Sequence, residues 1–236
     1  MKKYEEYYVK GFSKLNIANA KSKNRLNNIL SDILEDKLEK DFFLKSKYPG
    51  SYDLRPSVID YDSAFMEILK DINVKQILSE TTLKDLKLFH IQVRVVDSAY
   101  SYMDWHRDTY FYDNKKSGNF PPGHKIIYYP NFGSSRRRRL KLLEGSNKTM
   151  LYDQKNDYQL LNYLPTAMIY DNDDEMLLFD VSSMHGVIPE EKGEKSIRVI
   201  YNFLTKAQIL DSLSDDELHM RTMEEYESLF KEVTNE

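Results

Sequence analysis

Residues 86–96 of this 236-residue chain read LKLFHIQVRVV, a run of branched and aromatic side chains that is typical of a β-strand. Similar runs follow, and turn-forming residues such as Gly, Pro, Asn and Asp separate them. They are KIIYY at 125–129, RLKLL at 139–143, TAMIY at 166–170, EMLLFD at 175–180 and IRVIYNFL at 197–204. Short strands at these intervals, with no helical pattern between them, predict antiparallel sheets that close as a sandwich or barrel.

Helices are expected on both sides of this β-core. Apolar residues recur on one helical face at 22–40, and a second helical pattern covers 60–80. The passage KYPGSYDLRPS at 47–57 predicts a loop, and a capping box at 214–217 predicts a C-terminal helix. No repeat or long polar linker divides the chain. We therefore expect one domain over 1–236, mainly β with flanking helices, whose core lies at about 86–204.

The composition excludes several classes of protein. The chain has no cysteine, which rules out disulfides, zinc–thiolate sites and cysteine nucleophiles. The net charge of −4 gives no field that would attract nucleic acid or an anionic membrane. No apolar stretch has the length of a membrane span, and the basic N-terminus lacks the apolar segment of a signal peptide. We expect a cytoplasmic protein without nucleic-acid or membrane partners.

Three residues have the pattern of a metal site. His106 and Asp108 lie in SYMDWHRDTYF, and their spacing puts both side chains on one face of an extended segment. His185 lies just past an apolar strand, in LLFDVSSMHGV. Two imidazoles and one carboxylate form a facial triad that leaves coordination positions open, the pattern of non-haem iron(II) oxygenases. His90 in a strand and His219 in the C-terminal helix are expected to be structural or surface residues, and His124 is expected in a Pro-Gly turn.

The order of these residues resembles the phytanoyl-CoA dioxygenase-like family of iron(II)- and 2-oxoglutarate-dependent oxygenases. Trp105 precedes the His-x-Asp pair as an aromatic does in that family. LKLLEGSNK at 140–148 is similar to its G-P-L-x-x-x-P-G-S-H stretch, with Glu and Asn at the Pro and His places. DEMLLFDVSSMHGV at 174–187 is similar to its G-D-x-x-x-F-D-x-x-x-x-H-G stretch. The resemblance covers residues 86–204.

This resemblance implies a double-stranded β-helix, or jelly roll, with iron at one mouth. It maps His106, Asp108 and His185 onto the ligands of Fe(II), and Arg198 onto the arginine that grips 2-oxoglutarate through a planar pair. The loop from His185 to Arg198 is a little longer than the family norm. Gln92, and after it Arg94, are the candidates for a further cosubstrate contact. The implied reaction uses O2 and 2-oxoglutarate to hydroxylate a C–H bond and releases succinate and CO2; desaturation and ring formation are the other outcomes.

The substrate is expected to be a small molecule, free or carried on a phosphate, nucleotide or CoA. Trp105 and Tyr110 flank the His-x-Asp pair and either line a substrate pocket or pack in the barrel wall. The consecutive arginines either contact an anionic group of the substrate or form a solvated loop. They are Arg136, Arg137, Arg138 and Arg139. The alternatives to an oxygenase are a jelly-roll protein that binds metal or ligand without turnover, and a cupin-type metal-dependent isomerase.

Overall fold

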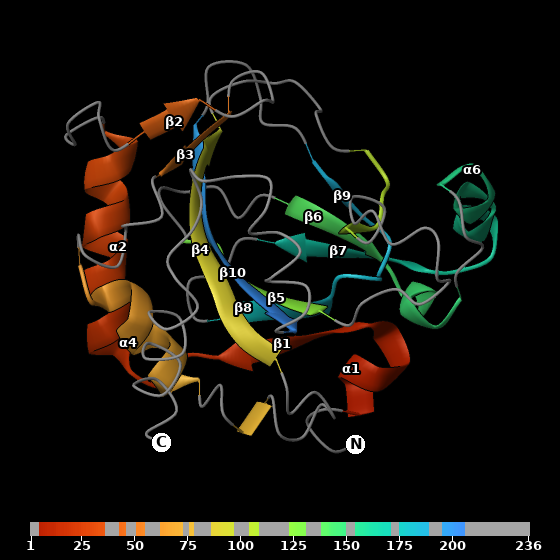
Figure 1. Cartoon of the computed structure of the whole chain (residues 1–236), viewed down its shortest axis with the longest axis horizontal. Coiled ribbons are helices and arrows are strands. Elements are labelled where there is room, and N and C mark those ends of the chain that lie inside the picture. Colours follow the sequence, from red (N-terminus) through yellow and green to blue (C-terminus); the bar gives the residue numbers. More distant parts are fainter. Residues whose placement is uncertain are drawn as a thin grey trace.

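Two antiparallel β-sheets face each other, and helices cover the outer side of the larger sheet (Figure 1). None of the helices in the described part of the chain has the length and apolarity needed to cross a membrane. The computed structural model describes residues 5–35, 43–45, 51–54, 62–72, 76–77, 86–96, 104–108, 123–130, 138–149, 154–170, 175–188 and 195–205.

The larger sheet has seven strands in the order β1-β8-β5-β10-β4-β3-β2. Their bounds are β1 (Phe12–Asn16), β2 (Phe43–Lys45), β3 (Ser51–Leu54), β4 (Leu86–Val96), β5 (Gly123–Tyr128), β8 (Glu175–Asp180) and β10 (Ser196–Thr205). The two longest strands, β4 and β10, lie side by side and place Arg94 directly opposite Arg198. A register shift after Asn202 interrupts this ladder.

The smaller sheet has three strands in the order β7-β6-β9, with bounds Thr166–Tyr170, Arg138–Leu143 and His185–Val187. Between β6 and β7 the chain forms three short helical elements. They are η4 (Ser146–Lys148), α6 (Gln154–Asp157) and η5 (Tyr158–Asn162). These elements extend from the end of the smaller sheet, away from the helices on the larger one (Figure 1).

Two long helices pack on the outer face of the larger sheet. Helix α2 (Ala20–Leu34) begins after Asn19, whose side chain accepts a hydrogen bond from the Lys21 amide and so caps the helix. Its buried stripe and that of α4 (Ala64–Asp71) meet the alternate residues of β4 and β10 that point outward. This main core contains, among others, Leu26, Leu30, Phe65, Ile68, Val93 and Val199. Helix α1 (Glu5–Lys10) adds Tyr7 to the same core.

The inner face of the larger sheet packs against the smaller sheet through a second apolar cluster. It includes Phe12, Ile127, Tyr129, Leu140, Leu142, Ile169, Phe179 and Ile200. Because successive side chains of a strand alternate between its faces, Gln92 and Arg94 point opposite to Ile91 and Val93. Polar side chains thus interrupt an otherwise apolar layer between the sheets, and that interruption marks the candidate site.

The six strands predicted from the sequence are confirmed as β4, β5, β6, β7, β8 and β10, and α2 and α4 confirm the helical patterns at 22–40 and 60–80. Two expectations were wrong. The predicted loop at 47–57 contains β3, and His124 lies in β5 with 1% of its surface exposed instead of in a turn. The sequence patterns also missed α1, β1, β2 and β9. The predicted C-terminal helix, with His219, falls outside the described residues.

Candidate metal centre

The three predicted metal ligands come from two short pieces of chain that pair with each other. His106 and Asp108 lie in the segment 104–108, where His106 forms an isolated β-bridge with His185, the first residue of β9. The amide of His106 donates to the carbonyl of His185 and the amide of His185 donates back, both at 2.9 Å. The Asp108 amide also donates to the Val181 carbonyl at 3.1 Å. Backbone pairing therefore joins the two short segments that carry the ligands.

A tight turn after β8 delivers His185 to the centre. The carboxylate of Asp180 accepts hydrogen bonds from the Ser182 amide at 2.8 Å and from the Ser182 hydroxyl at 2.6 Å. This is the side-chain-to-backbone bonding by which Asp stabilises a turn. The chain thereby leaves the larger sheet at Asp180 and enters the smaller sheet at His185, at the mouth of the space between them.

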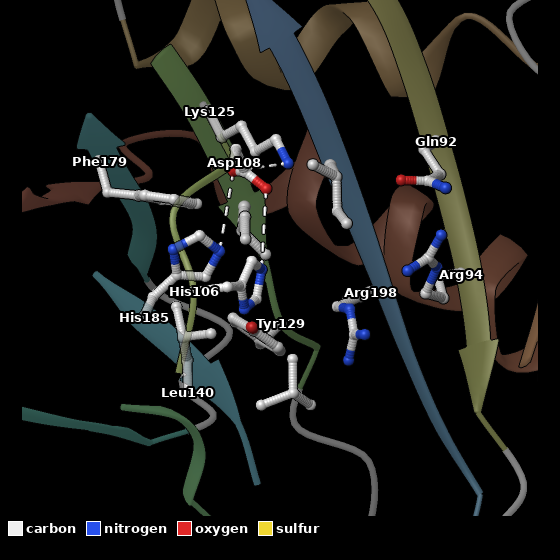
Figure 2. Close-up of a pocket in the computed structure, with 13 residues that line it drawn as sticks. Gln92, Arg94, His106, Asp108, Lys125, Tyr129, Leu140, Phe179, His185 and Arg198 are labelled. Atoms are coloured by element: carbon white, nitrogen blue, oxygen red, sulfur yellow. Dashed lines mark ion pairs between the residues drawn. The ribbon is translucent and has the colours of Figure 1, made fainter. Parts of the chain in front are cut away.

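The ligating atoms of the triad converge on one point (Figure 2). One nitrogen or oxygen atom from each residue lies within 4.8 Å of the others. The Nε2 atoms of His106 and His185 stand 3.9 and 3.7 Å from the carboxylate oxygens of Asp108. These gaps are too long for hydrogen bonds but shorter than about 4.2 Å, twice a metal–imidazole bond of about 2.1 Å. The spacing therefore fits ligands that share one ion.

Both imidazoles are oriented for coordination. The Nδ1 atom of His106 lies 2.6 Å from the carbonyl of Asp104, and that of His185 lies 3.0 Å from the carbonyl of Ser183. Because a carbonyl only accepts hydrogen bonds, each Nδ1 carries the proton and each Nε2 presents its lone pair to the centre. The ring of Phe179 packs edge-on against His185, with centroids 5.0 Å apart.

Burial and charge set the protonation states that a metal requires. Desolvation lowers the pKa of His106, and it lowers the pKa of His185 to about 3. For Asp108, burial raises the pKa, but the Lys125 ammonium and the two histidines outweigh it and bring it down to about 2. At neutral pH the centre thus presents two neutral imidazoles and a carboxylate, the donor set of a non-haem iron site.

The triad opens into a cavity of about 230 Å³ between the two sheets. Its far end carries Gln92, Arg94 and Arg198, and Figure 2 shows these side chains on the two neighbouring strands β4 and β10. The walls between the two ends include Ile127, Tyr129, Leu140, Phe179, Val187 and Ile200. A metal site at one end and arginines at the other suit a small acid that chelates through one end and carries a carboxylate at the other.

Lys125 is a site residue whose ion pair with a metal ligand the sequence patterns did not predict. Its ammonium lies 2.9 Å from Oδ2 of Asp108, and the side chain lines the cavity from β5 (Figure 2). Strand alternation could have identified Lys125, because it shares a face with the buried Ile127 in a strand of mainly buried residues. The Lys125 charge holds Asp108 ionised and turned toward the centre.

The remaining predicted residues lie away from the cavity or outside the described chain. Trp105 is half-buried against a separate apolar cluster with Leu143 and Met184, and the Lys141 ammonium lies 4.7 Å above its ring. It does not belong to the described residues that line the cavity. Tyr110, Arg136 and Arg137 are outside the described residues, whereas Arg138 and Arg139 begin β6. Their proposed contacts with a substrate stay predictions.

No protein-family model matches this sequence, and no curated protein matches it. Solved structures are nevertheless similar to it over most of the chain. The α-ketoglutarate-dependent epimerase SnoN from nogalamycin biosynthesis is 9% identical with a TM-score of 0.61, over 86% of this chain and 81% of SnoN. The carbocyclase SnoK of the same biosynthesis is 8% identical with a TM-score of 0.61, over 86% and 83%. HygX from Streptomyces hygroscopicus, solved with nickel, 2-oxoglutarate and hygromycin B, is 12% identical with a TM-score of 0.60, over 86% of each chain. This likeness confirms the predicted jelly-roll fold.

Proposed function

We propose that this protein is an iron(II)- and 2-oxoglutarate-dependent oxygenase. The observation that carries the proposal is the arrangement of the cavity, which has a buried His-Asp-His triad at one end and the paired arginines of β4 and β10 at the other. Three protein ligands leave three positions of an octahedral ion for a chelating 2-oxo acid and for O2. The similarity of the motifs at 140–148 and 174–187 to phytanoyl-CoA dioxygenase-like proteins, and the jelly-roll fold, support the same reading.

The cosubstrate is proposed to lie between the two ends of the cavity. Arg198 is 4% exposed and points into the cavity from β10, so its guanidinium would meet the distal carboxylate of 2-oxoglutarate in a desolvated setting. Arg94, opposite it on β4, and Gln92, two residues along that strand, offer further hydrogen-bond donors to the same molecule. Apolar residues such as Ile127 and Ile200 also line the cavity, and the lower local dielectric that they provide would strengthen this contact.

Bound iron would supply the redox chemistry that couples 2-oxoglutarate and O2 to C–H oxidation. In the proposed hydroxylation, one oxygen atom enters the substrate and the other enters succinate as CO2 leaves. The chain's part is to hold the ligands: Asp108 occupies the third position with a carboxylate, which Lys125 keeps ionised. In the family that the motifs resemble, halogenases have a small residue at this position, so the Asp108 carboxylate favours hydroxylation here.

The proposed substrate is a small metabolite, free or carried on a phosphate, nucleotide or CoA. Three of the similar structures are named for natural-product chemistry: SnoN and SnoK from nogalamycin biosynthesis, and HygX with hygromycin B bound. Since SnoN is an epimerase and SnoK a carbocyclase, epimerisation and ring closure are further candidate outcomes for this chain beside hydroxylation.

The test is succinate formation from 2-oxoglutarate by the iron-loaded protein, screened with a metabolite library. Mass spectrometry of the product separates hydroxylation, which adds one oxygen atom, from desaturation, ring closure or epimerisation. Under anaerobic conditions, iron(II) and 2-oxoglutarate together should give the visible charge-transfer band of the chelate. A protein that binds metal but shows neither the band nor succinate would instead be a metal-binding jelly roll or a cupin-type isomerase.

A further inference from the structure

The residue between the two ligands of the His-x-Asp pair is fully buried on the opposite side from the cavity. His106 and Asp108 face the metal position and line the cavity, whereas the Arg107 guanidinium lies against Asp157 and neighbouring backbone carbonyls. Its exposed fraction is 0%, and so is that of Asp157 in α6, with which it forms an ion pair. A buried arginine needs partners for all of its donors, since an unsatisfied buried charge is strongly destabilising.

All five N–H donors of Arg107 have an acceptor. Nε donates to Oδ2 of Asp157 at 2.6 Å and Nη2 donates to Oδ1 at 2.9 Å, a two-pronged pair that fixes the plane of the guanidinium. The other three donors reach backbone carbonyls: Nη1 donates to those of Ser146 and Ser182, and Nη2 donates to that of Thr149. The guanidinium therefore joins its own segment, 104–108, to residues 146–157 and to the turn at Ser182.

Two of these carbonyls lead directly to the third metal ligand. The Ser182 carbonyl immediately precedes that of Ser183, the acceptor for Nδ1 of His185. Ser146, besides accepting from Arg107, accepts through its hydroxyl oxygen from the amide of Met184, the residue before His185. The Arg107 side chain thus links the segment that carries His106 and Asp108 to the two groups that support His185, which are the turn at 182–183 and Ser146.

We propose that Arg107, held by Asp157, is the positioning residue of the metal centre. It sets the distance between the His-x-Asp segment and the turn before His185. Asp157, the last residue of α6, supplies its buried counter-ion. This inference rests on the proposed function only in so far as the triad binds a metal. A lysine would not replace it, because an ammonium has three donors and no planar fork.

The test uses the full chain and nickel(II) as a redox-inert probe, with nickel affinity and thermal stability measured separately. Outer partners that orient metal ligands are typically worth about 10- to 100-fold in metal affinity. We expect Arg107→Met to weaken nickel binding by about that factor and to lower the melting temperature. Tyr201→Phe is the matched control, because it removes a buried hydrogen bond to the Phe65 carbonyl in the main core, on the far face of the sheet. It should lower the melting temperature without changing nickel affinity.

The double variant Arg107→Met with Asp157→Leu separates positioning from plain stabilisation. Asp157→Leu removes the buried carboxylate that Arg107→Met leaves unpaired, so we expect the double variant to regain part of the lost thermal stability while nickel affinity stays reduced. The carbonyls of Ser146, Ser182 and Thr149 still lack their donor, which keeps the recovery partial. Nickel affinity that returns together with stability would overturn the proposal. If the double variant does not fold, Arg107→Lys decides the matter, and wild-type nickel affinity in that variant would also overturn it. Nickel binding that is insensitive to His185→Ala in the parent protein would contradict the metal centre itself.

Discussion

Replacing Arg198 by Gln gives the sharpest test of the proposed cosubstrate site. Arg198 is 4% exposed, lines the cavity and lies directly opposite Arg94. Removing one partner of a desolvated charge pair costs about 2–5 kcal/mol, and each 1.4 kcal/mol is tenfold in affinity. We therefore expect the dissociation constant for 2-oxoglutarate to rise by about 30- to 4000-fold. Metal affinity should change little, because Arg198 is at the other end of the cavity from the triad.

The assay is an anaerobic titration of 2-oxoglutarate into the iron-loaded protein, followed by the charge-transfer band and by calorimetry. Arg25→Gln makes the same chemical change on the outer helix α2, where the side chain is 47% exposed and pairs with Asp62 and Glu67. That control should leave 2-oxoglutarate binding unchanged. If Arg198→Gln binds 2-oxoglutarate like the parent protein, Arg198 does not hold the carboxylate, and Arg94→Gln or Lys125→Gln should then show the loss.

Three further predictions follow from the described contacts. Alanine at any one of the three triad positions should abolish stoichiometric iron binding, measured by metal analysis after desalting, while circular dichroism stays native; retained iron in all three variants would refute the site. Desolvation lowers the pKa of His124 to about 3 from 6.5, so the unfolded chain binds the proton more readily between these values. The free energy of unfolding should therefore fall as pH drops from about 6.5 toward 3, by up to about 1.4 kcal/mol per pH unit, and His124→Gln should flatten that slope in urea titrations. Gly11→Ala should cost at least about 1–3 kcal/mol of stability, because φ is +86° and a Cβ would lie 2.3 Å from Oγ of Ser183. Gly145→Ala, with φ +77° and its nearest neighbour at 3.5 Å, isolates the backbone part of that cost; equal losses in the two variants would show that the clash contributes nothing.

The long strands could be predicted from the sequence because a strand that is buried on both faces consists of a continuous run of branched and aromatic residues. LKLFHIQVRVV became β4, and TAMIY and EMLLFD became β7 and β8 with the predicted bounds. The missed strands are short, and their conformation depends on hydrogen bonds to a neighbouring strand. β9 has three residues, and β3 lies in a Pro- and Gly-rich passage where its ladder with β4 decides its conformation. His124 follows Pro and Gly in the sequence, and the sheet overrides that turn signal.

The structure brings together the three residues chosen as a triad: His106 and Asp108 are two residues apart in one short segment, and backbone hydrogen bonds pair that segment with His185. Gln92, Arg94 and Arg198 meet in the same cavity through the register of β4 and β10, which the sequence does not contain. The contacts of Lys125 and Arg107 with the site could not be predicted for a different reason. Their importance depends on partners, Asp108 for one and Asp157 for the other, that only the folded chain places beside them.

The mutual backbone hydrogen bonds of His106 and His185 also determine when the centre can form. They join two points separated by most of the β-core, so the bonds close a long loop whose entropy must first be offset by the packing of the two sheets. A chain emerging from the ribosome has no complete set of ligands until His185 has been synthesised and the smaller sheet has assembled. We therefore expect metal loading to follow the folding of the two sheets.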